Sequence, residues 1–225
     1  MMKLTIVYDN ETTRKDLTPA WGFACVIEAG KKILFDTGWD GNILLSNMRA
    51  LGHKPEDIDA VVLSHWHWDH IGGLPTVLAE TEGIEVIVPD SFSKHLRQEI
   101  SRNHKLRVVK KPEMLFDGVY STGELEGHFG DIKIGEQSLA VETSKGLVVV
   151  AGCSHPSVEK ILKASRLFGD VYGIVGGFHG FDKYEALKDL SLIVPTHCTQ
   201  HKREIFEGYK DNVKVGGVGW RISLD

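Results

Sequence analysis

The stretch LSHWHWDHIGG, residues 63–73, places three histidines, two tryptophans and one aspartate within six positions, from His65 to His70. In extended backbone, residues i and i+2 point the same way, so His65 and His67 can reach one metal ion together. Asp69 and His70 are adjacent, and a turn must follow before both can reach a neighbouring ion. Imidazole with carboxylate favours zinc, iron or manganese over copper(I). Each pair supplies only two ligands, so the remaining ligands must come from elsewhere in the chain.

The ordinary alternative is that these are structural or surface histidines without metal. A single histidine usually has such a role, but four polar groups packed at a strand end without a cation are desolvated and repel one another. We therefore predict a metal site. Period-two geometry predicts that Trp66 faces away from the ligands, toward the packing that stiffens the loop. Trp68, between the two ligand pairs, is expected to border the pocket and touch substrate.

Size and charge limit the class of protein. A chain of 225 residues with 42% hydrophobic content predicts a single domain, residues 1–225, with a sizeable core. The net charge of −5 offers no polyanion-binding surface, so we expect a small-molecule substrate and no nucleic-acid partner. Three cysteines, no signal peptide and no apolar run of membrane-spanning length predict a cytoplasmic protein without a membrane partner. Composition leaves the oligomeric state open.

The hydrophobic pattern predicts strands first, and then strands that alternate with helices. Predicted strands cover residues 3–8, 22–29, 31–36, 60–63, 84–88, 106–109, 114–116, 138–143, 146–151, 171–175 and 192–194, with short strands near 213 and 220. Predicted helices cover residues 43–51, 74–79, 91–101, 158–168, 183–190 and 200–209, with a helical turn at 55–57. Ser91 is the predicted cap of the third helix.

Four of the buried strands are followed by polar residues suited to a site. These residues are Ser64-His65, Gly152-Cys153-Ser154-His155, Gly176-Gly177-Phe178-His179 and Pro195-Thr196-His197-Cys198. Sites in α/β proteins form where strand ends meet at one edge of a sheet, so we expect these segments to converge. His155 and His197 then supply the missing ligands, although a hydrogen-bonded structural role is the alternative for each. His201 lies on the helix that follows His197 and is predicted to be a surface residue.

The segment His65-Trp66-His67-Trp68-Asp69-His70 resembles the His-x-His-x-Asp-His signature of the metallo-β-lactamase superfamily. Asp36-Thr37-Gly38, after an apolar strand, is similar to the upstream aspartate of that superfamily. The resemblance spans essentially the whole chain. It implies an α/β (α+β) protein of the four-layer αββα sandwich type, with two sheets face to face and helices outside.

Later motifs are similar to one branch of that superfamily, which includes archaeal dihydropterin-methyl-(ribofuranosyl)aminobenzene-phosphate synthases of methanopterin biosynthesis. They are Glu124-Leu125-Glu126-Gly127, Gly135-Glu136-Gln137-Ser138-Leu139, Gly152-Cys153-Ser154-His155-Pro156, Gly176-Gly177-Phe178-His179 and Pro195-Thr196-His197-Cys198-Thr199. A shared fold does not by itself carry a shared substrate.

The resemblance implies two ligand sets. His65, His67 and His155 would hold one divalent ion, and Asp69, His70 and His197 would hold the other, with zinc expected and iron or manganese as alternatives. Asp36 would orient the histidine loop from behind the ligands. Many superfamily members carry a metal-bridging aspartate where this chain has Cys153. Cys153 or Glu136 could replace it, and a small buried residue at a tight turn is the alternative for Cys153.

The implied activity is metal-dependent hydrolysis of a small ester, lactone or phosphoester, with Asp69 as both ligand and proton acceptor. His179 is not needed as a ligand. It could bind an anionic group or act as an acid or base, or it could be structural. Two alternatives stay open: a transferase that joins a pterin-methyl diphosphate to a ribofuranosyl-aminobenzene phosphate, and a non-catalytic metal-binding or ligand-sensing module. Gly176-Gly177 would let backbone approach a ligand.

Overall fold

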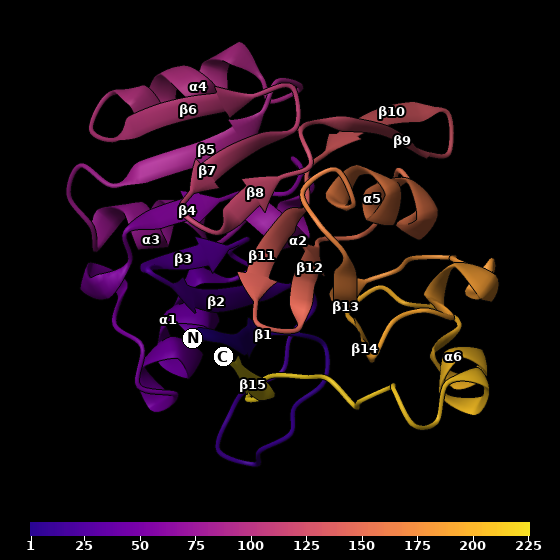
Figure 1. Cartoon of the computed structure of the whole chain (residues 1–225). Helices are drawn as coiled ribbons and strands as arrows, with labels where there is room; N and C mark the ends of the chain where they lie inside the picture. The colour runs from indigo at the N-terminus through magenta and orange to yellow at the C-terminus, as the bar shows by residue number, and fades with distance from the viewer.

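Two β-sheets stacked face to face form the centre of the protein, and a computed structural model describes all its residues, 1–225 (Figure 1). The first sheet has seven strands in the order β15-β1-β2-β3-β4-β5-β6. Their bounds are Met2–Tyr8 (β1), Ala24–Ala29 (β2), Lys31–Phe35 (β3), Ala60–Val62 (β4), Glu85–Pro89 (β5), Lys105–Val109 (β6) and Arg221–Leu224 (β15). β1 to β3 pair antiparallel, whereas β3 to β6 run parallel.

The second sheet has six strands in the order β14-β13-β12-β11-β8-β7. Their bounds are Glu113–Phe116 (β7), Val119–Ser121 (β8), Leu139–Thr143 (β11), Gly146–Ala151 (β12), Val171–Gly177 (β13) and Leu192–Thr196 (β14). β12, β13 and β14 run parallel, so they end at the same edge. A separate hairpin, β9 (Leu125–Phe129) with β10 (Ile132–Glu136), projects beside the second sheet (Figure 1).

Side-chain alternation along the strands divides the core into three layers. In β12, Val148 and Val150 face the first sheet, whereas Val149 faces the helices on the other side. Since successive residues of a strand point to opposite faces, one strand fills two layers. Each fully buried valine or leucine stabilises the fold by about 1.5–3 kcal/mol relative to exposure. The predicted αββα sandwich is therefore confirmed.

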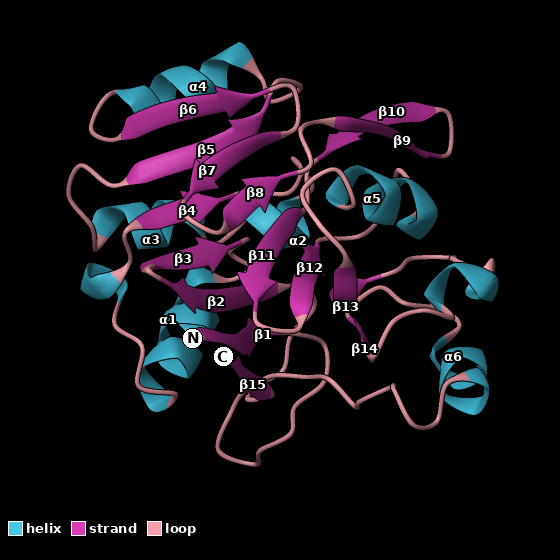
Figure 2. Ribbon diagram, viewed as in Figure 1, coloured by secondary structure: helices cyan, strands magenta, loops and turns pink.

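Helices cover the outer faces of both sheets (Figure 2). The helices beside the first sheet are α1 (Gly41–Ala50), the turn η1 (Pro55–Asp57), α2 (Trp68–Ile71), α3 (Leu74–Ala79) and α4 (Lys94–Ser101). The helices beside the second sheet are α5 (Val158–Ser165), the turn η2 (Tyr184–Leu187) and α6 (Lys202–Gly208). None of these helices combines the length and apolar character needed to cross a bilayer.

Several predicted boundaries are wrong, for local reasons. The helix predicted from Ser91 begins at Lys94 with Ser93 as its cap, because Ser91 instead contacts Glu124 and Gly135. The helix predicted over 183–190 is one 3-10 turn. The sequence pattern predicts no strand within residues 119–136, yet three strands form there. Its hairpin strands leave large apolar side chains exposed, so they lack the alternation that marks a half-buried strand.

Candidate metal centre

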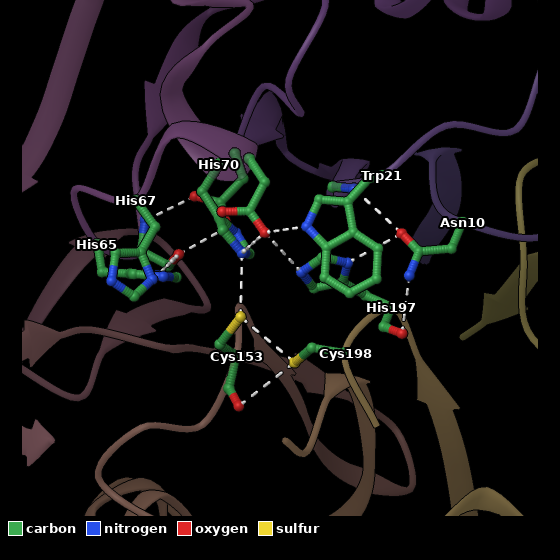
Figure 3. Close-up of polar contacts among 12 residues, drawn as sticks. Asn10, Trp21, His65, His67, His70, Cys153, His197 and Cys198 are labelled. Atoms are coloured by element: carbon green, nitrogen blue, oxygen red, sulfur yellow. Dashed lines mark hydrogen bonds and ion pairs between the residues drawn. The ribbon is translucent and has the colours of Figure 1, made fainter. Parts of the chain in front are cut away.

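The structure brings together the strand ends that the sequence pattern predicted to meet. β4 belongs to the first sheet, and β12, β13 and β14 belong to the second. Figure 3 shows His65, His67, His70, Cys153, His197 and Cys198 gathered around one point, although they come from distant parts of the chain.

A short helix follows the first histidines and aims the signature segment inward. Backbone at His67 is extended, and α2 begins immediately after it. The His70 N–H donates to the His67 carbonyl at 3.0 Å, which closes the first turn. His65 and His67 therefore leave an extended segment, while Asp69 and His70 leave a helical turn, as the adjacency of the last two required.

Asp36 anchors this segment from behind. Its carboxylate is fully buried and accepts hydrogen bonds from the Ser64 N–H at 2.6 Å and the Ser64 hydroxyl at 2.7 Å. It also lies 2.7 Å from His70 Nδ1. Burial opposes a charge on His70, but the Asp36 carboxylate outweighs it and raises the pKa of His70 to about 9. Because Nδ1 is held by Asp36, Nε2 of His70 faces the site.

His65, His67 and His155 form the first donor group, which we call the histidine site. Their ligand atoms all lie within 4.8 Å of one another, and His155 Nε2 is 3.2 Å from His67 Nδ1. Burial lowers the pKa of His65 and His67. Burial, with the neighbouring His67, lowers the pKa of His155 to about 3. All three rings are therefore neutral near pH 7, which is the form that binds a metal.

Asp69, His70 and His197 form the second donor group, the mixed site, also within 4.8 Å. Asp69 Oδ2 lies 3.3 Å from His197 Nε2 and 3.9 Å from His70 Nε2. Burial opposes the charge on Asp69, but the contact with His197 and the charge of His70 hold its pKa below the usual range. Burial lowers the pKa of His197 to about 4. The mixed site thus offers one carboxylate and two imidazoles, and the His70 ring must release a proton before its Nε2 can bind a metal.

Three residues behind the mixed site were missed by the sequence reasoning. Asp9 accepts the backbone N–H of His197 at 3.1 Å, and Asn10 Oδ1 lies 3.1 Å from His197 Nδ1. The Trp21 indole donates to Asp69 Oδ2 at 2.8 Å. Asp9-Asn10 directly follow β1, so they are a fifth polar strand end that the same pattern could have found. Nothing local to Trp21 predicts its contact.

Cys153 stands at the centre, whereas Glu136 is engaged elsewhere. Glu136 is buried, and its carboxylate accepts the backbone N–H groups of Cys153, Ser154 and His155 at 2.8–3.0 Å. Glu136 therefore shapes the loop, and the suggestion that its carboxylate replaces the bridging aspartate is wrong. Cys153 Sγ lies 3.1 Å from His70 Nε2. Burial raises the pKa of the Cys153 thiol, so it is neutral in the metal-free protein.

The side chains present fit a divalent cation. Nε2 of His65 is buried without a hydrogen-bond partner, and the buried Nε2 of His197 has only the Asp69 carboxylate, 3.3 Å away and outside hydrogen-bond geometry. Each of these nitrogens belongs to a donor group. A buried polar atom without a hydrogen-bond partner is costly, and a cation bound in each donor group would satisfy the nitrogen of that group. Nitrogen, oxygen and sulfur donors are the ligands that zinc takes in proteins.

An aromatic-walled cavity of about 330 Å³ opens onto this centre. Five large aromatic side chains line it: Trp21, Trp39, Trp66, Trp68 and Phe129. Trp68 borders the cavity, as predicted. Trp66 was expected to pack inward, but it is 36% exposed and lines the same cavity. The reason is that β4 ends at Val62 and the backbone bends at Trp66, so the strict alternation of an extended strand does not hold there.

His179 faces the same cavity but belongs to no donor group. Its ring centre lies 5.1 Å from that of His155, and burial lowers its pKa, so the ring is neutral near pH 7. Gly176 and Gly177 do not line the cavity, contrary to expectation. A Cβ at Gly176 would lie 2.0 Å from the Ala151 carbonyl, so these glycines allow close packing of β13 on β12. His201 lies outside both donor groups, on the partly exposed start of α6.

Comparison with known proteins agrees with this geometry. Residues 31–124 match the model of the β-lactamase superfamily domain. A 7,8-dihydropterin-6-methyl-4-(β-D-ribofuranosyl)-aminobenzene-5'-phosphate synthase of Methanocaldococcus jannaschii is 31% identical, over 81% of each chain. The chain belongs to the metallo-β-lactamase superfamily. Within that superfamily it shares the branch of this archaeal synthase.

Two further relatives extend the comparison across the superfamily. A metal-dependent hydrolase of Pyrococcus furiosus is 25% identical, over 77% of this chain and 78% of its own. The crystal structure of a metal-dependent hydrolase of the β-lactamase superfamily superposes with a TM-score of 0.80 at 21% identity, covering all of both chains. The chain therefore has the fold of the superfamily's metal-dependent hydrolases.

Proposed function

We propose that the protein is a metal-dependent hydrolase of a small ester, lactone or phosphoester. The observation that carries this proposal is the pair of donor groups at the floor of one cavity, with buried Nε2 atoms of His65 and His197 left for a cation. His65, His67 and His155 would hold one ion, and Asp69, His70 and His197 a second. A divalent ion bound there supplies Lewis acidity and brings the pKa of water toward neutrality.

The protein's own side chains would transfer the protons and hold the reacting groups in position. Asp69 stays ionised because its pKa is held low, and its Oδ1 is the atom that we assign as proton acceptor. Trp21 fixes the other oxygen, Oδ2, by donating to it. His179 is neutral and borders the cavity, so it can donate to an anionic group of the substrate or pass a proton to a leaving group.

The test is metal analysis of anaerobically purified protein, followed by a screen with that metal. The panel contains phosphomonoesters, phosphodiesters, lactones and thioesters. We expect one or two equivalents of zinc, iron or manganese and turnover of one substrate class. The His67→Ala variant should lose both, whereas His201→Ala, at a histidine outside the donor groups, should keep both. Bound metal without turnover of any substrate would instead favour a metal-binding or ligand-sensing module.

A second function is favoured by the aromatic wall of the cavity. Five large rings around a metal centre suit a flat heterocycle, and the archaeal relative is named for a dihydropterin product. The alternative is transfer of a pterin-methyl group from its diphosphate to a ribofuranosyl-aminobenzene phosphate. Pyrophosphate release is measured from a pterin-methyl diphosphate with and without the acceptor. Release that requires the acceptor identifies a transferase, whereas release that ignores it identifies a hydrolase.

A further inference from the structure

Two cysteine side chains meet at the metal centre. The Cys198 thiol lies 3.3 Å from Cys153 Sγ, and Cys153 Sγ lies 3.1 Å from His70 Nε2 (Figure 3). They come from different strand ends, since Cys153 follows β12 and Cys198 follows β14. Both line the cavity that opens onto the centre. Two sulfur atoms are therefore present where the ligands of the two sites adjoin.

Cys25 shows what an ordinary buried cysteine looks like in this fold. It lies in β2 within the apolar layer between the sheets and is fully buried. Cys153 is also nearly fully buried, at 3% exposure, yet its neighbours are His70 and Cys198 instead of apolar side chains. Filling space in the core explains Cys25 but not the position of Cys153.

The sulfur of Cys153 belongs to two potential ligand sets at once. It lies within 4.8 Å of the ligand atoms of His65 and His70, and within the same distance of those of His197 and Cys198. His197 gives a second sign of a missing cation, because its buried Nε2 faces the Asp69 carboxylate at 3.3 Å without a hydrogen bond between them. The Glu136 carboxylate, held by three backbone N–H groups, does not occupy this position.

We propose that Cys153 and Cys198 are metal ligands. Cys153 would bind as a thiolate between the two ions, where many relatives carry aspartate, and Cys198 would add a second sulfur beside Cys153 and His197. Each thiol that binds gives up its proton to solvent, as metal binding to cysteine requires. Sulfur donors favour zinc or iron over manganese or magnesium at this position. The inference rests on the proposed metal binding but not on the reaction.

The test uses cobalt(II) as a spectroscopic substitute and measures the near-ultraviolet sulfur-to-cobalt charge-transfer band. The full-length protein, reduced and loaded with two equivalents of cobalt, should show the band. Cys153→Ser should lose most of it, and Cys198→Ser should lose part. Cys25→Ser is the matched control and should leave the band unchanged. X-ray absorption of the zinc-loaded protein should give sulfur scatterers at about 2.3 Å, the usual zinc–sulfur distance.

Two outcomes would overturn the inference: no charge-transfer band in the wild type, or a band that survives both substitutions. Cys153→Asp covers the case in which Cys153→Ser does not fold. It restores the carboxylate of the relatives, so it should keep the metal content while losing most of the band. These readouts do not depend on turnover. A protein that shows the band but hydrolyses nothing keeps this inference and loses the hydrolase proposal.

Discussion

The histidine site and the mixed site lie side by side but are built differently. The histidine site has three neutral imidazoles, two of which are only half-buried at the cavity. The mixed site has a carboxylate, a histidine held by Asp36, and a histidine held by Asn10 and Asp9. The rings of the histidine site contact no buried carboxylate or amide, whereas Asp36 contacts the His70 ring and Asn10 contacts the His197 ring. We therefore expect damage to the histidine site to cost metal, and damage behind the mixed site to cost stability as well.

The largest expected effect is that of His67→Ala. Removal of a direct ligand should lower metal affinity by more than about 100-fold, since loss of an outer partner alone costs 10–100-fold. Because His67 is half-buried at the cavity, the metal-free variant should unfold at nearly the wild-type temperature. Atomic emission and calorimetry check the two parts. Unchanged metal content in the variant would contradict the assignment of His67, with His201→Ala as the control.

Asp36→Ala should affect both metal and fold. Metal affinity should fall by about 10–100-fold, because His70 loses the partner that orients it. The free energy of unfolding should fall by about 3–5 kcal/mol, because a buried ion pair loses one member. Ser64→Ala is the matched milder change, since it removes only the hydroxyl that donates to Asp36. If Asp36→Ala leaves the metal-free protein as stable as wild type, the contrast between the two sites fails.

Asp9, behind the mixed site, makes the free energy of unfolding depend on pH. Burial raises the pKa of Asp9 from 3.8 to about 6, so the folded state binds this proton more tightly than the unfolded state. The stability that this group contributes is fully present below pH 3.8 and is lost as pH rises through 6. The loss is roughly 3 kcal/mol for a shift of about two units. The check is urea unfolding of protein from which metal has been removed with a chelator. Between pH 4 and pH 7, the free energy of unfolding should fall less for Asp9→Asn than for wild type. Equal drops would contradict the role of Asp9.

The sequence predicted the centre because its signals are local. His65, His67, Asp69 and His70 share one segment, and His155 and His197 each follow a buried strand. Contacts that depend on tertiary packing left no such signal. Trp21 reaches Asp69 from a loop 48 positions away, and the loop that carries Cys153 is held by Glu136.

The fold shows the same division between local and tertiary information. Strands with a buried face, such as β12, were predicted to the residue, because alternation and apolar runs record burial directly. The exposed β9–β10 hairpin was missed, since its strands lack the alternation of apolar and polar residues that marks a half-buried strand. The prediction for Trp66 was wrong because the backbone bends at Trp66, and the alternation of an extended strand does not continue past β4.

The smallest expected effect concerns the cavity wall shared by both sites. Trp68 is 56% exposed and Trp66 is 36% exposed, so alanine at either position should leave stability and metal content nearly unchanged. If a flat substrate stacks on this wall, each substitution should raise KM by about 2- to 13-fold, in line with an aromatic contact of about 0.5–1.5 kcal/mol. Leu167→Ala, at an exposed apolar residue outside this cavity, is the control. A fall in kcat with unchanged KM would mean instead that the rings position the reacting atoms, because ground-state binding would then be intact.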